Sequence, residues 1–258
     1  MPNKSLWSRE ETLAALHVYL LLPFGQLHQR HPLIKQVASW LGRTPGSVAM
    51  KLANIASLDA DITSTGRTGL GGASAQDRKI WSEFMDQPAP MTQDAARAFD
   101  QLAEGNNAPT AIDVVDEVPE VAEGKTRTAT VQVRVNQARF RKQVLANYDS
   151  ACCISGLAHP RLLIASHIVP WSDDAGNRLN PRNGLCLSAL HDKAYDAGLL
   201  TVLPDYRVRV SKGLNTTKAD AFLSATLTAF DGQPIRIPSR FKPDPELLEK
   251  HATRFGFV

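Results

Sequence analysis

A polar, acidic stretch over residues 104–128 constrains the fold of this chain more than any other feature of its sequence. Residues 101–130 hold two Lys and Arg against six Asp and Glu, with Asn, Pro and Gly between them. A segment of this composition cannot bury enough apolar surface to form a core of its own. We therefore expect a linker at 104–128 that separates two domains, residues 1–103 and residues 129–258.

The two expected domains differ in charge. Residues 1–100 carry ten Lys and Arg against nine Asp and Glu, a net charge of +1, whereas residues 131–258 carry 17 against 11, a net charge of +6. A basic surplus favours partners that carry phosphate. The C-terminal domain is therefore the better candidate for binding nucleic acid.

Several other classes of protein are disfavoured. No apolar run reaches the length that a membrane-spanning helix needs, and the first residues lack the apolar core of a signal peptide. We expect a cytoplasmic protein with no membrane partner. The cysteines, Cys152, Cys153 and Cys186, provide neither a disulfide framework nor paired C-x-x-C sites, so we expect buried thiols and no structural zinc.

A short apolar run, Leu162–Ala165, predicts a buried strand and leads to His167. Neutral imidazole, with an ordinary pKa of about 6.5, accepts a proton near pH 7, which makes His167 a candidate general base. Pro170 and Trp171 then break the strand and open a polar loop.

The chain returns from this loop at Asn183. Residues 185–187 predict a second strand, and Ser188 predicts the cap of a helix that follows it. On that helix Asp192 and Asp196 lie four residues apart and share a face. A divalent cation would relieve their mutual repulsion, and hard oxygen ligands favour Mg²⁺ or Mn²⁺. A solvated helix face is the alternative interpretation.

Four short segments in this order resemble the HNH endonuclease family, of the restriction-enzyme type, over about residues 134–200. The matching segments are Cys153–Gly156, Ala165–Trp171, Asn183–Leu185 and Tyr195–Leu199. The resemblance implies a ββα metal site that hydrolyses DNA. In that site His167 is the general base, Asn183 orients the loop around it, and His191 is a further catalytic residue that contacts phosphate or metal.

The sequence departs from the family pattern at two places. Many members carry Asp or His directly before the base, where this chain has Ser166. The third motif residue commonly follows the asparagine by nine positions, which gives Asp192 rather than His191. We therefore assign the metal to Asp192 and Asp196. Because serine is a poor metal ligand, the ion is either held loosely or completed by DNA phosphate.

Four arginines of this half are candidates for contacts with DNA phosphate. They are Arg139, on an amphipathic helix expected over residues 137–148 after a strand over 129–135, and Arg161, Arg178 and Arg182 around the motif. For Arg139, an ordinary solvated helix face is an equally good explanation.

The N-terminal domain predicts several helices. One begins after Ser8 and ends before Pro23, a second covers residues 31–41, and a third begins at Pro45 after the cap Thr44. This order resembles a helix-turn-helix or Myb-like unit. The candidate DNA contacts are Arg43, Ser47, Lys51 and Asn54. A helical scaffold with a solvated face is the alternative, and the glycine-rich loop over 63–72 is either ordered on DNA or a plain linker.

These observations predict an α+β protein: an N-terminal helical, helix-turn-helix-like domain followed by a ββα-metal HNH nuclease domain. The expected function is metal-dependent DNA cleavage in restriction or defence. A homodimer is expected if both strands are cut, because one HNH site cuts one strand. The rival hypothesis is a non-catalytic DNA-binding regulator with a relic HNH motif, which the missing acid at Ser166 favours.

Overall fold

The computed structural model describes residues 6–67, 69–108, 127–174, 176–216, 221–238 and 240–258, without the side chains of 127–134, 215 and 216. The chain forms two compact units, Met1–Gln143 and Val144–Val258, hereafter the helical unit and the hairpin unit. The division falls within helix α7 (Arg127–Asn147), later than the expected linker, most of which lies outside the described residues. The strand predicted over 129–135 is wrong, because this segment belongs to α7.

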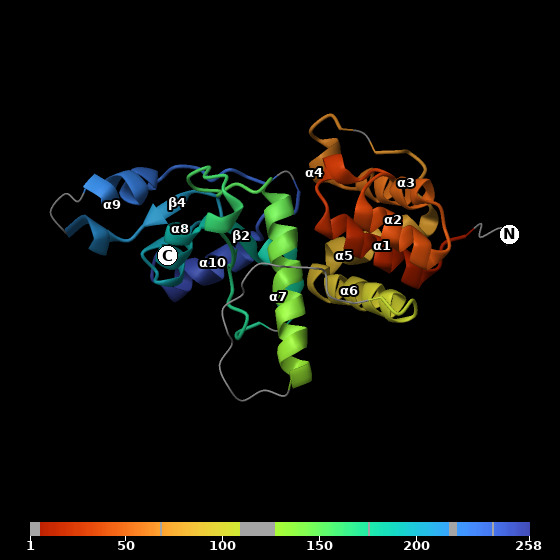
Figure 1. The fold of residues 1–258 in the computed structure, drawn as a ribbon. Helices are drawn as coiled ribbons and strands as arrows, with labels where there is room; N and C mark the ends of the chain where they lie inside the picture. The colour runs from red at the N-terminus through yellow and green to blue at the C-terminus, as the bar shows by residue number, and fades with distance from the viewer. Residues whose placement is uncertain (1–5, 68, 109–126, 175, 217–220, 239) are drawn as a thin grey trace. The chain divides into compact units, whose positions relative to one another are not determined.

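The helical unit is built around its first helix (Figure 1). Its helices are α1 (Arg9–Leu21), α2 (Pro32–Leu41), α3 (Pro45–Ala56), α4 (Ala60–Thr63), α5 (Ala75–Asp86) and α6 (Pro88–Glu104), with a 3-10 turn η1 (Phe24–Gln26). Helix α1 contacts α2, α3, α5 and α6, and its residues from Thr12 to Leu21 are buried on every side. It therefore forms the centre of the unit rather than one amphipathic face of it.

Local signals set the ends of these helices as expected. Ser8 and Glu11 form a reciprocal capping box at the start of α1. Helix α2 ends at Gly42, whose φ of 59° lies in the left-handed region, and Thr44 caps α3 with Pro45 as its first residue. The predicted pair of helices with a tight connection is present.

The hairpin unit contains two small antiparallel sheets. Strand β1 (Leu163–His167) pairs with β2 (Gly184–Ser188), and β3 (Leu200–Val202) pairs with β4 (Val208–Val210). The remaining elements are α8 (Ala189–Asp196), α9 (Ala221–Thr226), α10 (Pro245–Arg254) and the 3-10 turns η2 (Pro160–Leu162), η3 (Gly176–Leu179), η4 (Pro181–Asn183), η5 (Lys212–Thr216) and η6 (Thr228–Phe230). Helix α8 packs on both strands of the first hairpin, so the predicted order of strand, strand and helix is confirmed.

The core of the hairpin unit lies between α8, the hairpins and α10. All of β2 is buried, and α10 packs against β3. This core fixes the end of β1, where His167 leaves the sheet. None of the helices in the described parts of the chain is both long and apolar enough to cross a membrane.

Candidate active site

The end of the first hairpin places His167 beside the strand that follows the loop. His167 pairs with Gly184 in the register, and the next amide, that of Ile168, donates to the Asn183 carbonyl oxygen at 3.0 Å. Pairing of the two strands therefore brings together His167 and Asn183, which lie sixteen residues apart in the sequence. The two residues lie at the same end of the hairpin.

His167 is held as a neutral base. Its Nε2 lies 3.1 Å from the Arg178 carbonyl oxygen, which can only accept a hydrogen bond, so Nε2 carries the proton and Nδ1 carries the lone pair. Burial lowers the pKa of His167 to about 4, and the bond to the carbonyl only partly offsets this effect. At neutral pH the ring is therefore unprotonated at Nδ1, as a general base requires.

Asn183 closes the loop between the two strands. Its side chain is 1% exposed; Oδ1 accepts from the Val169 amide at 2.9 Å, and Nδ2 donates to the carbonyl oxygens of Val169 and Asn177, both at 3.2 Å. Every polar atom of the amide is thus used on loop backbone. This is the geometry that a positional role for Asn183 requires.

Asp192 and Asp196 lie on α8, next to the end of β1. Burial raises the pKa of Asp192; the negative charge of Asp196 raises it further, and the nearby Ser166 hydroxyl opposes both effects. Partial burial also raises the pKa of Asp196, against the charges of Lys193 and Arg254. The contact with Ser166 places Asp192 beside the residue that precedes the base.

This donor set fits a hard divalent cation. Mg²⁺ is commonly bound by one or two carboxylates, with waters and substrate phosphates completing its shell, and Asp192 and Asp196 provide two carboxylates whose charges repel each other. No group of three or more His, Cys, Asp and Glu side chains suited to a metal occurs among the described residues. The protein alone would therefore supply only part of the coordination.

The structure corrects the role expected for His191. Its side chain is 3% exposed and lies in the first turn of α8. Nδ1 lies 3.0 Å from the Ser188 hydroxyl and 3.4 Å from the Cys152 sulfur, and Nε2 lies 2.8 Å from the Thr226 carbonyl oxygen. Because both ring nitrogens are engaged in the interior, His191 cannot contact a phosphate in this conformation; it joins the Cys152 turn to the end of α9.

The same contacts change the acidity of the Cys152 and His191 pair. Burial raises the pKa of Cys152, but hydrogen bonds with His191 and Ser155 outweigh it and bring the pKa down to about 6. Burial lowers the pKa of His191, but the bonds to Cys152 and the Thr226 carbonyl oxygen outweigh it, so the net shift is upward. The sequence contained no signal for this pairing, because the residues are 39 positions apart.

The three arginines near the motif differ in their freedom to reach DNA. Arg161 is exposed in η2, just before β1. Arg178 donates from Nε to the Trp171 carbonyl oxygen at 3.1 Å, and Arg182 lies 3.7 Å from the Asp244 carboxylate. Arg182 lies just before Asn183, at the end of the hairpin that holds His167, whereas Arg161 lies at the opposite end, before Leu163. Both remain candidates for phosphate contacts.

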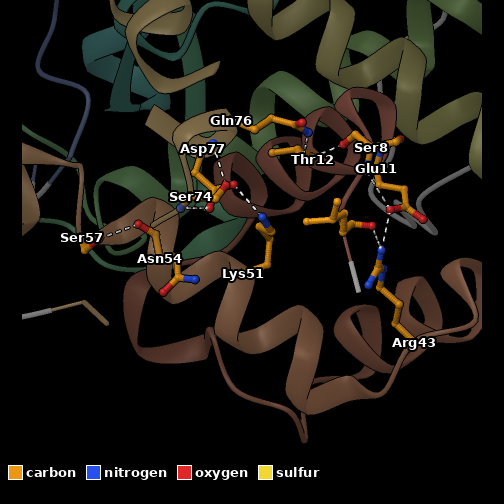
Figure 2. Close-up of polar contacts among 11 residues, drawn as sticks. Ser8, Glu11, Thr12, Arg43, Lys51, Asn54, Ser57, Ser74, Gln76 and Asp77 are labelled. Atoms are coloured by element: carbon orange, nitrogen blue, oxygen red, sulfur yellow. Dashed lines mark hydrogen bonds and ion pairs between the residues drawn. The ribbon is translucent and has the colours of Figure 1, made fainter. Parts of the chain in front are cut away.

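Arg43 and Lys51, two of the DNA contacts predicted for the helical unit, are instead engaged with acidic side chains of that unit (Figure 2). Lys51 is 6% exposed, and its Nζ lies 2.6 Å from Oδ1 of Asp77, whose side chain is fully buried. Arg43 bonds to the Glu11 carboxylate and to the Leu6 carbonyl oxygen, both at 2.8 Å. Both cations are neutralised inside the unit and serve packing rather than phosphate binding.

The remaining part of the predicted DNA face is partly covered. Ser47 and Asn54 are half-buried on α3. A Cβ built on Gly69 would lie 2.4 Å from the Ala53 carbonyl oxygen, and one on Gly72 would lie 3.4 Å from the Asn54 side chain. The glycine-rich loop therefore packs against the C-terminal part of α3. At Gly69 and Gly72 this loop is therefore packed, unlike a plain linker.

Arg139 is also internal. Its side chain is 1% exposed on α7, and its guanidinium forms a two-pronged ion pair with Asp100 of α6. A phosphate contact by Arg139 is therefore excluded in this conformation. The acid that pairs with it lies 39 residues away, so helical periodicity alone did not reveal the pair.

Trp171 is a site residue to which the sequence assigned no role beyond breaking the strand. Its ring meets that of His167 edge to face, with the centroids 5.6 Å apart. Its position four residues after the base, in an otherwise polar loop, is the signal that marks it.

The hairpin and the helix packed on it form a ββα arrangement, with His167 at the end of the first strand. Residues 152–203 match the family model for HNH endonucleases, which confirms the resemblance over this segment. No curated protein matches the chain. The matched segment contains His167, Asn183, Asp192 and Asp196.

Proposed function

We propose that this protein is a divalent-metal-dependent DNA endonuclease. The observation that carries the proposal is the placement of His167: a half-buried, neutral histidine at the end of β1, directly after the residue that lies near Asp192 of α8, within the segment that matches HNH endonucleases. This arrangement puts a proton acceptor beside a site suited to a cation. Hydrolysis of a phosphodiester needs both.

In the proposed reaction, Nδ1 of His167 takes the proton from the attacking water while the Arg178 carbonyl oxygen holds Nε2–H. Asn183 keeps the loop fixed around the base. Asp192 and Asp196 would hold Mg²⁺ or Mn²⁺, which when bound stabilises the charge that develops on the phosphate oxygens. Arg161 and Arg182 would contact the neighbouring phosphates.

The test is cleavage of plasmid DNA by the full chain, with and without EDTA. His167→Ala should lower the rate by on the order of 10²- to 10⁴-fold, because a general base contributes about that factor, while DNA binding stays close to that of the unmodified protein. His159→Ala, at an exposed histidine of the same unit, is the matched control. A His167→Ala protein that cuts at the original rate would remove His167 from the mechanism.

The carboxylates are tested by metal titration of cleavage. Asp192→Asn and Asp196→Asn should each raise the Mg²⁺ or Mn²⁺ concentration needed for half-maximal rate or abolish cleavage, whereas Asp205→Asn, at an exposed carboxylate, should not. Unchanged metal dependence in both α8 variants would refute the ligand assignment.

One observation favours the rival function of a non-catalytic DNA-binding regulator. Ser166 stands where many HNH endonucleases have an acid or histidine, and the described residues offer only two carboxylates for the metal. DNA binding without EDTA-sensitive cleavage would decide for this rival.

The proposal extends to a restriction-type role against foreign DNA in the cytoplasm, with a homodimer as the species that cuts both strands. The basic surplus of the C-terminal half supports DNA as the partner. A helix-turn-helix function for α2 and α3 is not part of it, because Arg43 and Lys51 are engaged with Glu11 and Asp77.

A further inference from the structure

Four contacts join His167, Trp171 and Arg178 into a closed triangle. The Arg178 carbonyl oxygen lies 3.1 Å from Nε2 of His167, and the Arg178 Nε donates to the Trp171 carbonyl oxygen, also at 3.1 Å. The Arg178 guanidinium lies over the Trp171 indole, 5.2 Å from its centroid. The indole meets the His167 ring edge to face, at an interplanar angle of 87°. Each residue of the triangle therefore contacts the other two.

This triangle orients the His167 imidazole, which the pairing of the strands alone does not do. The group that orients the imidazole is a backbone carbonyl of η3, in the loop, rather than a side chain of a strand or helix. A carbonyl is a useful orienter only if the peptide plane is held in place. Asn183 fixes the neighbouring residue through the Asn177 carbonyl oxygen, and the Arg178 side chain ties its own peptide to Trp171.

We propose that Trp171 and Arg178 are positioning residues for the general base, and that together they hold His167 in the tautomer protonated at Nε2. This inference rests on the proposed nuclease function. It assigns Arg178 a role through His167 rather than the phosphate contact that its charge alone indicates. Trp171 restricts rotation of the ring, because its indole meets the imidazole edge to face.

Two substitutions separate positioning from phosphate binding. Arg178→Lys keeps the positive charge but loses the Nε–H that donates to Trp171. If Arg178 acts through His167, Arg178→Lys lowers kcat on the order of 10²-fold, the loss expected for a misplaced catalytic group, and leaves KM for DNA unchanged. Arg209→Lys, at a half-exposed arginine of β4, is the control. A raised KM with kcat retained would overturn the proposal in favour of phosphate binding.

Trp171 is tested by a pair of variants. Trp171→Ala removes the aromatic edge, whereas Trp171→Phe keeps an aromatic ring beside His167. We expect Trp171→Ala to lose activity about as strongly as Arg178→Lys, and Trp171→Phe to recover most of it. The proton–nitrogen NMR spectrum of each folded variant shows whether the overall structure is retained. Equal activity in both variants and the unmodified protein would overturn the proposal.

A readout independent of cleavage is the tautomer of His167. In ¹⁵N-labelled full chain at neutral pH, the ring nitrogens should show a proton on Nε2, and the Nε2–H population should fall in Trp171→Ala and Arg178→Lys. An Nδ1–H tautomer in the unmodified protein, or an unchanged Nε2–H population in both variants, would refute the proposal. If the unmodified protein does not cleave DNA, the nuclease function fails while this measurement still decides the positioning role.

Discussion

Lys51 illustrates, at the scale of one residue, how a basic side chain on a polar helix face becomes part of a core. Its ammonium group is paired with Asp77 at 2.6 Å and lies 4.9 Å from the centroid of the Trp7 ring. Arg43 lies over the same ring at 4.4 Å. The Trp7 ring thus contacts two cations, Arg43 and Lys51, and each cation forms an ion pair with a carboxylate.

This arrangement predicts the effect of removing the charge. Lys51→Met should lower the free energy of unfolding by about 3–5 kcal/mol, because it leaves the buried Asp77 carboxylate without a cation to balance its charge. Chemical denaturation of the full chain measures this loss. The double variant Lys51→Met with Asp77→Asn should be more stable than Lys51→Met alone, and equal stability of the two would contradict the burial argument.

His251 predicts a pH dependence of stability. It stacks on Tyr195 with the ring centroids 3.6 Å apart and shares a hydrogen bond of 2.8 Å with the Thr201 hydroxyl. Burial lowers its pKa to about 4. The unfolded chain, with a pKa of about 6.5, binds more protons between these values, so folding stability is lost as the pH falls from 6.5 towards 4.

Each pH unit in this range should remove at most about 1.4 kcal/mol through His251. Denaturation at pH 7 and pH 5 should show a smaller pH difference for His251→Gln than for the unmodified protein, while His159→Gln keeps the original difference. His17 and His167 have lowered pKa values too and contribute in the same direction, whereas His191, with a raised pKa, opposes them. An unchanged pH difference in His251→Gln would contradict the assignment.

At the scale of elements, the glycine-rich loop after α4 is fitted to the backbone of α3. A Cβ on Gly69 would lie 2.4 Å from the Ala53 carbonyl oxygen and 2.5 Å from the Ser57 nitrogen, whereas one on Gly71 would have no atom within 4 Å. Gly69→Ala should therefore lower the free energy of unfolding by roughly 1–3 kcal/mol. Gly71→Ala should leave thermal unfolding nearly unchanged, and equal melting temperatures for the two variants would contradict the packing of this loop.

Features formed by residues close together in the sequence could be predicted, whereas contacts between distant residues could not. The hairpin and α8 could be predicted because strand, loop, strand and cap occur within one short segment. Helix α7 was partly misread: alternation of Val131, Val133 and Val135 indicates a strand, but the helix extends through them. The pairs of Lys51 with Asp77 and of Arg139 with Asp100 cross 26 and 39 residues, so no local pattern reveals that these cations are internal.

At the scale of the whole molecule, the division of the chain within α7 has a testable consequence. Arg139 pairs with Asp100 inside the helical unit, so residues after the expected linker contribute to the fold of this unit. A fragment of residues 1–147 should therefore melt at a higher temperature than a fragment of residues 1–108. Arg139→Ala in the longer fragment should remove much of the difference. Equal melting temperatures of the two fragments would show that the helical unit folds without residues 109–147, so its boundary would lie at the acidic stretch instead.

The amide of Asn183 fastens the loop at Val169 and again at Asn177, so the exposed turn that begins at Ser172 is enclosed between two fixed points. We expect substitutions in that turn to disturb the strand ends less than substitutions at Val169, Asn177 or Asn183 would. For the proposed nuclease, this turn is therefore the part of the loop where residues can be exchanged with the least effect on His167. For the same reason it is the segment to randomise when a library of altered cleavage preferences is built on this scaffold.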